Sequence, residues 1–212
     1  MSNEKMVILF QGDSITDGNR GRDEDSSYIL GQGYPFLISG KLGFELAEKQ
    51  PIFINRGGSG NRASELYARW NEDALNLRPD LISILIGVND VGWALNSITD
   101  RFERSYRHLL EETKSVLPDT GLVLCEPFLL NTGLDRWEER KRQIEHYQRT
   151  VRRLAEQFQA VFVPLQEAFN NACTRADAAY WIWDGVHPTA AGHDLIAREW
   201  LNAVQNSSLR IT

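Results

Sequence analysis

Five short apolar runs, spread along the whole chain, constrain the fold of this sequence more than any other feature. They lie at 7–10, 52–54, 81–86, 122–125 and 161–163. Each run is too short for a helix and lacks alternating polar residues, a pattern typical of strands buried on both faces. Helical patterns fill most of the spaces between the runs. This alternation predicts an α/β fold, a five-stranded parallel sheet in a three-layer α/β/α arrangement.

The segments between the predicted strands carry helical spacing of apolar residues. We expect helices at about 34–46, 66–77, 98–117, 136–158, 166–174 and 190–204, with prolines at positions 79 and 118 ending two of them. The segment 18–33 has no apolar periodicity, and its length makes it a candidate functional loop. Because no repeat or break in composition divides the chain, we predict one domain over 1–212 with a polar tail at about 206–212.

Composition excludes several classes of partner. The chain has 212 residues, of which 42% are hydrophobic and 25% are charged, as in ordinary globular proteins. Its 23 basic and 29 acidic residues leave a net charge of −6, so neither nucleic acid nor an anionic membrane is an expected partner. Two cysteines, Cys125 and Cys173, form neither a disulfide framework nor a metal cluster. No signal peptide or membrane span is evident, which predicts a cytoplasmic protein.

Polar residues follow the predicted strands where a ligand would bind. In an open α/β sheet, ligands bind outside the carboxyl ends of the strands. Ser14 follows the first strand, Gly60 lies in a glycine-rich loop after the second, and Asn89 follows the third. A late loop before the last helix carries Asp184 and His187. We therefore expect these residues to meet at one edge of the sheet.

The types of these residues predict nucleophilic catalysis. A serine hydroxyl needs a nearby base of near-neutral pKa before it can attack. Asp184, three residues before His187, can curl back and accept a hydrogen bond from the imidazole, which fixes the tautomer. Pro188 favours an extended backbone at His187 and so presents the ring.

Three donors are available for a developing oxyanion. They are the backbone N–H of Ser14, the backbone N–H of Gly60, which no side chain shields, and the side-chain amide of Asn89. Donors placed in this way stabilise the negative charge of a tetrahedral intermediate.

Taken together, four short blocks resemble those of the SGNH (GDSL-like) hydrolase superfamily, in the same order and over essentially the whole chain. The blocks are Gly12-Asp13-Ser14-Ile15-Thr16, Gly57-Gly58-Ser59-Gly60, Gly87-Val88-Asn89-Asp90 and Asp184-Gly185-Val186-His187. The resemblance implies a flavodoxin-like sheet, no metal, no cofactor, and ester hydrolysis through an acyl-enzyme. Ser14 would be the nucleophile, His187 the base and Asp184 its orienter, with Gly60 and Asn89 as oxyanion donors.

The chain departs from the family pattern in two places. An isoleucine replaces the leucine of the Gly-Asp-Ser-Leu block, which is a conservative change. Gly58 stands where the family usually has a bulky apolar residue, so we expect a looser loop around Gly60.

Longer stretches look like the bacterial carbohydrate acetylesterases, including acetylxylan esterases. They are the residues from Gly12 to Asp17, from Asn55 to Arg62 and from Trp183 to Pro188. The resemblance implies an acetylated oligosaccharide or another small acyl ester as substrate, and a possible homo-oligomer. Candidates for stacking on sugar are Trp93, Trp137, Trp181 and Trp183, while Asp13 and Trp183 are candidates for substrate binding. A general short-chain lipolytic esterase is the alternative.

Hypotheses from other classes account for fewer residues. The glycine-rich segment 58–63, with Asp80 about 20 residues on, matches a dinucleotide fingerprint and would indicate a nucleotide-binding oxidoreductase. It leaves Ser14, Asn89 and the late loop unexplained. Asp13 and Asp90 resemble metal ligands, but carboxylates in such turns more often cap helices. The intact serine, histidine and aspartate set also argues against an inactive sugar-binding module.

Overall fold

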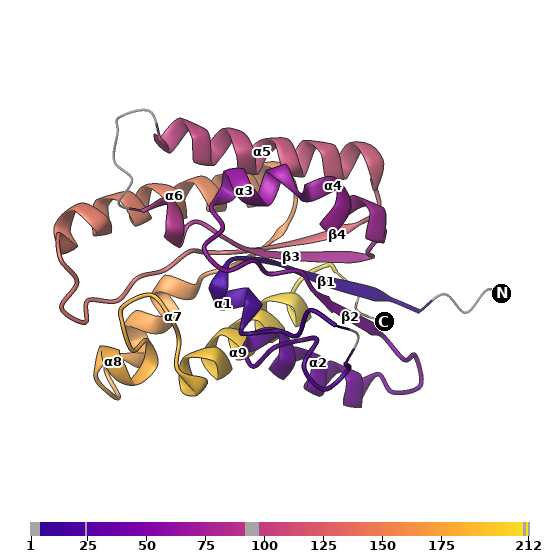
Figure 1. The fold of residues 1–212 in the computed structure, drawn as a ribbon, viewed down its shortest axis with the longest axis horizontal. Helices are drawn as coiled ribbons and strands as arrows, with labels where there is room; N and C mark the ends of the chain where they lie inside the picture. Colours follow the sequence, from indigo (N-terminus) through magenta and orange to yellow (C-terminus); the bar gives the residue numbers. More distant parts are fainter. Residues whose placement is uncertain (1–4, 24, 92–97, 210, 212) are drawn as a thin grey trace.

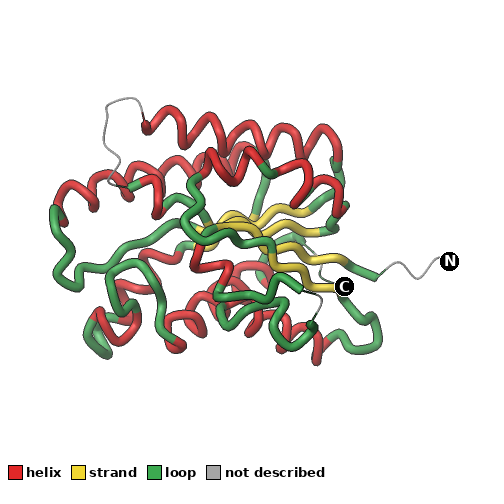
Figure 2. Tube along the Cα trace, viewed as in Figure 1, coloured by secondary structure: helices red, strands yellow, loops and turns green. Residues whose placement is uncertain are grey.

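A five-stranded, all-parallel sheet forms the centre of the molecule (Figures 1 and 2). The computed structural model describes residues 5–23, 25–91, 98–209 and 211. The strands are β1 (Val7–Gly12), β2 (Ile52–Asn55), β3 (Leu81–Leu85), β4 (Gly121–Cys125) and β5 (Val161–Val163), in the order β2-β1-β3-β4-β5. The predicted α/β sheet and its five strands are therefore confirmed.

The middle of the sheet explains the continuous apolar runs. All five residues of β3 are buried, and Ile8, Leu9 and Phe10 of β1 are fully buried. The edge strand β2, in contrast, has one exposed residue, Ile52, and β5 is half-buried over two of its three residues. Strands covered on both faces need apolar side chains at every position, which is why their residues do not alternate.

Helices cover both faces of the sheet (Figure 1). One face carries α3 (Ala63–Ala68), α4 (Trp70–Asp73), α5 (Ile98–Val116) and α6 (Trp137–Gln157), with α5 packed against α3 and α6. The other carries α2 (Tyr34–Glu45), α7 (Leu165–Ala172), α8 (Ala178–Trp181) and α9 (Ala190–Gln205), with α9 packed against α2, α7 and α8. A short helix, α1 (Ser14–Asp17), follows β1 directly. This is the expected three-layer architecture.

Buried rings connect β1 to the layer formed by α2 and α9. The ring of Phe10 lies 5.9 Å from the rings of both Tyr34 and Trp200, measured between centroids. The indole N–H of Trp200 donates to the hydroxyl of Ser83 on β3 at 2.9 Å. A tryptophan can be fully buried at low cost because its one polar group finds a partner in this way.

The structure corrects three details of the predicted elements. The helix expected over 66–77 is divided into α3, α4 and a 3-10 turn (Leu75–Leu77), because the backbones of Arg69 and Ala74 leave the helical region. The helices α1 and α8 were not predicted, since four residues are too few to show a period. The last residues are not wholly polar and free, because Leu209 and Ile211 pack against the core.

The strand order places Ser14 at the point where the sheet changes direction. β1 pairs with β2 on one side and with β3 on the other, so successive strands are added in opposite directions from β1. Ligands of doubly wound sheets bind at such a switch point, outside the carboxyl ends of the strands. Ser14 begins α1 two residues after Gly12, the last residue of β1.

Candidate active site

A tight turn between β1 and α1 presents Ser14. A Cβ on Gly12 would lie 2.2 Å from the hydroxyl of Thr16 and 2.3 Å from the carbonyl oxygen of Leu85, so only glycine fits there. The Asp13 carboxylate caps α1 by accepting the N–H of Ile15 at 3.0 Å. The turn therefore holds the half-buried Ser14 in a fixed position at the carboxyl end of β1.

His187 lies within hydrogen-bond distance of both Ser14 and Asp184. Its Nε2 is 3.0 Å from the Oγ of Ser14, and its Nδ1 is 2.7 Å from the Oδ2 of Asp184. The Oδ1 of Asp184 also accepts the backbone N–H groups of His187 and Val186, at 2.7 and 3.0 Å. The structure thus brings together the three residues predicted to carry the reaction, in the chain serine, histidine, aspartate.

The environment of Asp184 keeps it ionised. Partial burial by itself would raise the pKa of its carboxyl group. Hydrogen bonds from the backbone and ring of His187 and from the Val186 N–H outweigh that effect and lower the pKa below its usual value. A carboxylate that stays charged can orient a neutral imidazole and stabilise the imidazolium ion.

The loop that carries Asp184 and His187 is held from both sides. Gly185 has a φ of 84°, and a Cβ there would lie 2.7 Å from the carbonyl oxygen of Leu130, so the position requires glycine. Leu130 in turn donates its N–H to the Gly185 carbonyl at 3.1 Å. Within the loop, Trp183 donates its N–H to the carbonyl of His187 at 3.1 Å. The base is therefore presented by a braced loop.

The three proposed oxyanion donors come from three different loops. Gly60 is exposed with a φ of 78°, and nothing lies within 4 Å of the place its Cβ would take. Among the described residues, the backbone N–H groups of Ser14 and Gly60 have no acceptor. The side-chain amide of Asn89 donates to the carbonyl of Asn61 at 3.1 Å, which leaves its second hydrogen for another acceptor.

An arginine that the sequence analysis did not single out braces these loops. Arg69 donates through Nε to the side-chain oxygen of Asn61 at 2.8 Å. Its two terminal nitrogens donate to the side chain of Gln11 at 3.0 Å, to the carboxylate of Asp73 at 2.9 Å and to the carbonyl of Gly12 at 3.3 Å. One guanidinium therefore joins the end of β1 to the loop of Gly60. Its only sequence signal is a lone arginine inside a helical pattern.

The same contacts explain the glycine at position 58. A Cβ on Gly58 would lie 2.8 Å from the side-chain oxygen of Asn61, so that side chain fills the adjacent space. The Gly58 N–H also donates to the Gly12 carbonyl at 2.9 Å, and the Asn61 N–H donates to the Gly58 carbonyl at 3.1 Å. Asn61 and Arg69 thus provide contacts at the place where the family usually has a bulky apolar residue.

Two buried aspartates, Asp13 and Asp90, stabilise the site loops by accepting backbone N–H groups. Burial raises the pKa of Asp13 to about 7 and that of Asp90 to about 7, and each accepts a backbone N–H, from Ile15 and Ala63 respectively. Asp13 is only 1% exposed, so the structure does not bring it to the protein surface, and we interpret it as support for the turn.

The tryptophans proposed to stack on sugar lie in different environments. Trp183 is 63% exposed, and its ring is stacked 6.2 Å from the ring of His187 at an angle of 23°. Trp181 is buried, and Trp137 is half-buried against the core. Trp93 lies outside the described residues. Of the three that the structure describes, Trp183 alone is therefore both exposed and beside His187.

The loop 18–33 is fastened to the turn that carries Ser14. Arg20 donates to the carbonyl of Gly57 at 3.1 Å, and Arg22 forms an ion pair with Asp17. The buried side chain of Asn55 donates to the carbonyls of Thr16 and Leu30, at 2.7 and 2.9 Å. This loop is thus attached both to the turn that carries Ser14 and to the segment that follows β2. Asn55 stands at the end of β2 as Asn89 stands after β3, a parallel that the sequence analysis missed.

The dinucleotide-binding hypothesis is wrong because Asp80 lies at the opposite edge of the sheet from the glycine-rich segment. Asp80 precedes β3 and accepts the N–H of Val7, the first residue of β1, at 2.7 Å. It therefore lies at the amino ends of the strands, opposite to the edge where the glycine-rich segment 58–63 lies. An acidic residue there cannot bind a ribose held at the carboxyl edge.

The described part of the chain contains neither a candidate metal cluster nor a candidate membrane span. Residues 5–23, 25–91 and 98–209 contain no group of three histidine, cysteine or acidic side chains that could hold a metal ion. Over the same residues, no helix is both long and apolar enough to cross a membrane. Cys125 is buried, Cys173 is half-buried, and both are free thiols.

Comparison with known proteins agrees with the geometry. The profile of the GDSL-like Lipase/Acylhydrolase family matches residues 10–195. An acetylxylan esterase of Geobacillus stearothermophilus is 36% identical over 208 residues, which are 93% of this chain and 93% of that protein.

Solved structures give the same result. A protein described as a GDSL-like lipase from Parabacteroides merdae has a TM-score of 0.88 and 39% identity, over 95% of this chain and 96% of the other. The structure of the Geobacillus acetylxylan esterase has a TM-score of 0.83 and 33% identity over 100% of both chains. Catalytic mutants of that esterase replace a serine, an aspartate or a histidine by alanine.

Proposed function

This chain belongs to the GDSL-like lipase/acylhydrolase family, and we propose that it removes acetyl groups from acetylated carbohydrates through an acyl-enzyme on Ser14. The observation that carries the proposal is the unbroken chain of contacts from Ser14 through His187 to Asp184, at 3.0 and 2.7 Å. The enzyme is a carboxylic-ester hydrolase, and acetylated xylo-oligosaccharides are its proposed substrates because the similar Geobacillus protein is an acetylxylan esterase.

In the first half of the proposed reaction, His187 takes the proton of the Ser14 hydroxyl while the Oγ of Ser14 attacks the ester carbonyl carbon. Asp184 holds the ring so that Nε2 faces Ser14, and it stabilises the imidazolium ion. The carbonyl oxygen becomes negatively charged and accepts hydrogen bonds from the N–H groups of Ser14 and Gly60 and from the amide of Asn89. The bond between the carbonyl carbon and the sugar oxygen then breaks, His187 gives its proton to that oxygen, and the acetyl group stays on Ser14.

In the second half, water replaces the sugar. His187 removes a proton from the water, whose oxygen attacks the acetyl carbonyl carbon in the same set of donors. When that intermediate collapses, the bond between the acetyl carbon and the Oγ of Ser14 breaks. His187 returns the proton to that Oγ, and acetate is released. No other group is required to balance the reaction.

Trp183 is the proposed contact for the sugar. Its exposed ring stands beside His187, and its apolar face suits the C–H face of a pyranose ring, while its position narrows the space for a long acyl chain. We therefore expect acetyl esters to be preferred over longer ones.

The test is acetate release from a panel of acetylated xylose and xylo-oligosaccharides, compared with p-nitrophenyl acetate and p-nitrophenyl octanoate. The proposal predicts release from the sugars and faster cleavage of acetate than of octanoate esters. Cleavage of octanoate esters at the higher rate, without release from sugars, would instead establish a general lipolytic esterase. Cytoplasmic location and homo-oligomerisation also belong to the proposal, and cell fractionation and light scattering would test them.

A further inference from the structure

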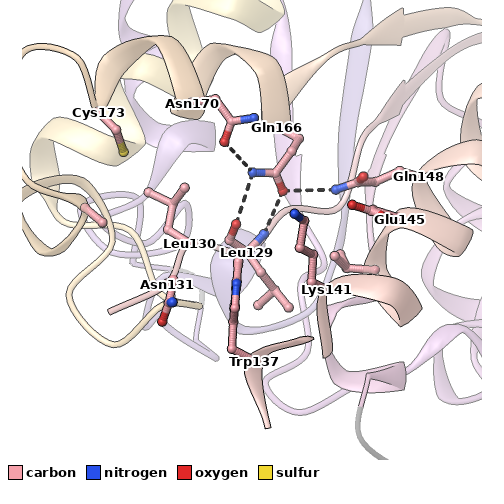
Figure 3. Close-up of a pocket in the computed structure, with 12 residues that line it drawn as sticks. Leu129, Leu130, Asn131, Trp137, Lys141, Glu145, Gln148, Gln166, Asn170 and Cys173 are labelled. Atoms are coloured by element: carbon pink, nitrogen blue, oxygen red, sulfur yellow. Dashed lines mark hydrogen bonds between the residues drawn. The ribbon is translucent and has the colours of Figure 1, made fainter. Parts of the chain in front are cut away.

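A cavity lies beyond β5, between α6, α7, the start of α8 and the segment 129–131 (Figure 3). Its volume is about 310 Å³, near the lower limit of pockets that bind small molecules. The apolar part of its wall comes from Leu129, Leu130, Ile144 and the half-buried ring of Trp137. The mechanism proposed above uses none of the residues that line this cavity.

One glutamine fixes the polar part of the wall (Figure 3). The amide nitrogen of Gln166 donates to the carbonyl of Leu129 and to the side-chain oxygen of Asn170. Its amide oxygen accepts the N–H of Leu129 and the side-chain amide of Gln148. All four distances are 3.0 Å, so the side chains around Gln166 are held in place before a ligand arrives.

Several polar groups of the cavity remain without a partner. The exposed Lys141 and the half-buried Glu145, one turn apart on α6, make no hydrogen bond or ion pair within the described part of the chain. Gln148 is about nine-tenths buried and uses only its amide nitrogen, toward Pro127 and Gln166. Its oxygen lacks a donor among the residues that the structure describes. The cavity therefore offers both donors and acceptors, next to the polar wall that Gln166 holds in place.

These groups favour one class of ligand. One ammonium and one carboxylate balance each other, so the cavity attracts neither anions nor cations by net charge. Free donors and acceptors side by side match hydroxyl groups, each of which both donates and accepts. An aromatic ring and apolar side chains in the same wall match the C–H faces of a sugar ring. A neutral saccharide fits this combination.

The cavity lies at the same edge of the sheet as Ser14. Gln166 follows the end of β5, Ser14 follows the end of β1, and β3 and β4 lie between those strands. Three strand spacings of about 4.8 Å give a separation of roughly 14 Å. Leu130 belongs to the cavity wall and donates its N–H to Gly185, the neighbour of Asp184. A ligand that reaches both places must be longer than one sugar.

We propose that this cavity binds a distal saccharide unit of an oligosaccharide ester whose acetyl group lies at Ser14. The inference rests on the proposed function, because it assumes that the substrate is a carbohydrate ester. It adds a specific consequence: the cavity contributes only to substrates long enough to span the distance between the two places.

The test compares substrates of increasing length in three variants. Lys141→Ala and Glu145→Gln change cavity groups that are not in the core, whereas Arg142→Ala changes an exposed neighbour on α6 outside the cavity. We expect the two cavity variants to lower kcat/KM about tenfold on acetylated xylotetraose. Their kcat/KM on acetylated xylose and on p-nitrophenyl acetate should stay within about twofold of the native value, and Arg142→Ala should change nothing.

Two results would overturn the inference while leaving the proposed function intact. One is an equal loss on the monosaccharide and the oligosaccharide, and the other is no loss on either. If the native enzyme releases acetate from no sugar, the proposed function itself fails. Calorimetric titration of the native enzyme with unacetylated xylotetraose then judges the cavity separately, because binding that Lys141→Ala abolishes would support a saccharide site and no binding would refute it.

Discussion

Arg69 is expected to control the catalytic rate although it touches none of the reacting groups. Its guanidinium donates to Asn61, whose carbonyl holds the amide of Asn89, and to the carbonyl of Gly12, two residues before Ser14. The Arg69→Ala variant therefore releases one support shared by the loops that carry all three proposed oxyanion donors. We expect the donors to lose their alignment with the developing charge.

The size of the effect follows from what remains. Loss of one oxyanion donor costs about 10²–10³ in kcat. Three hydrogen bonds from backbone N–H groups still hold the loop in the variant. They run from Gly58 to the carbonyl of Gly12, from Asn61 to the carbonyl of Gly58, and from Ala63 to the carboxylate of Asp90. The donors should therefore shift without leaving. We expect kcat to fall about ten- to a hundredfold, or about 1.4–2.8 kcal/mol in the barrier, with KM within about threefold.

The variant should also lose stability. Gln11 is fully buried, and its side-chain oxygen accepts a hydrogen bond from Arg69 at 3.0 Å. A buried acceptor left without its donor costs about 1–3 kcal/mol in the free energy of unfolding. Urea denaturation measures this loss, and Arg198→Ala, which breaks an exposed ion pair with Asp194, is the matched control with little expected change.

Kinetics on p-nitrophenyl acetate separate a positioning role from a merely structural one. If Arg69 acts through Asn61, the double variant with Asn61→Ala should lose little more rate than the worse single variant. The rate of phosphonate inactivation, which forms a tetrahedral adduct, should fall in parallel with kcat. A normal kcat in a folded but destabilised Arg69→Ala enzyme would refute the reasoning, as would fully additive losses in the double variant.

Three further predictions concern other sites. Asn89→Ala should lower kcat about 10²–10³-fold with little change in KM, measured on p-nitrophenyl acetate, since it removes one oxyanion donor. Burial lowers the pKa of His193 to about 4 from 6.5, and its ring accepts the N–H of Tyr34. As the pH falls, the unfolded chain binds a proton at this histidine before the folded chain does. The free energy of unfolding should therefore be unaffected by His193 above about pH 6.5 and fall by about 3 kcal/mol as the pH drops to 4. Urea titrations at several pH values should show this dependence, reduced in His193→Gln. Ser83→Ala should cost about 1–3 kcal/mol in urea denaturation, because the buried N–H of Trp200 loses its acceptor.

The sequence predicted the sheet and the four site loops because both depend on local patterns. Continuous apolar runs specify buried parallel strands, and polar residues just after such runs must lie at one edge of the sheet. The spacing of Asp184 and His187 predicted their contact because an aspartate three residues before a histidine in a tight turn can curl back onto the imidazole. The structure shows that contact at 2.7 Å.

The features that the sequence did not predict depend on contacts between distant segments of the chain. Arg69 looked like one polar residue in a helix, and only the packing of that helix beside β1 brings it to Asn61 and Gly12. For the same reason, the family pattern showed only that Gly58 lacks a bulky side chain. It could not show that the side chain of Asn61 fills the adjacent space. Burial of Asp13 likewise follows from the sheet around it.

The most direct test of the central claim is the mass of the enzyme after reaction with a serine-directed reagent. Ser14 lies 3.0 Å from His187 in a half-buried turn, so we predict one adduct per chain from a sulfonyl fluoride or phosphonate. Peptide mapping should place that adduct on Ser14, with full loss of esterase activity, and Ser14→Ala should form none. An adduct on another residue, or a Ser14→Ala enzyme that keeps near-normal turnover, would contradict the account.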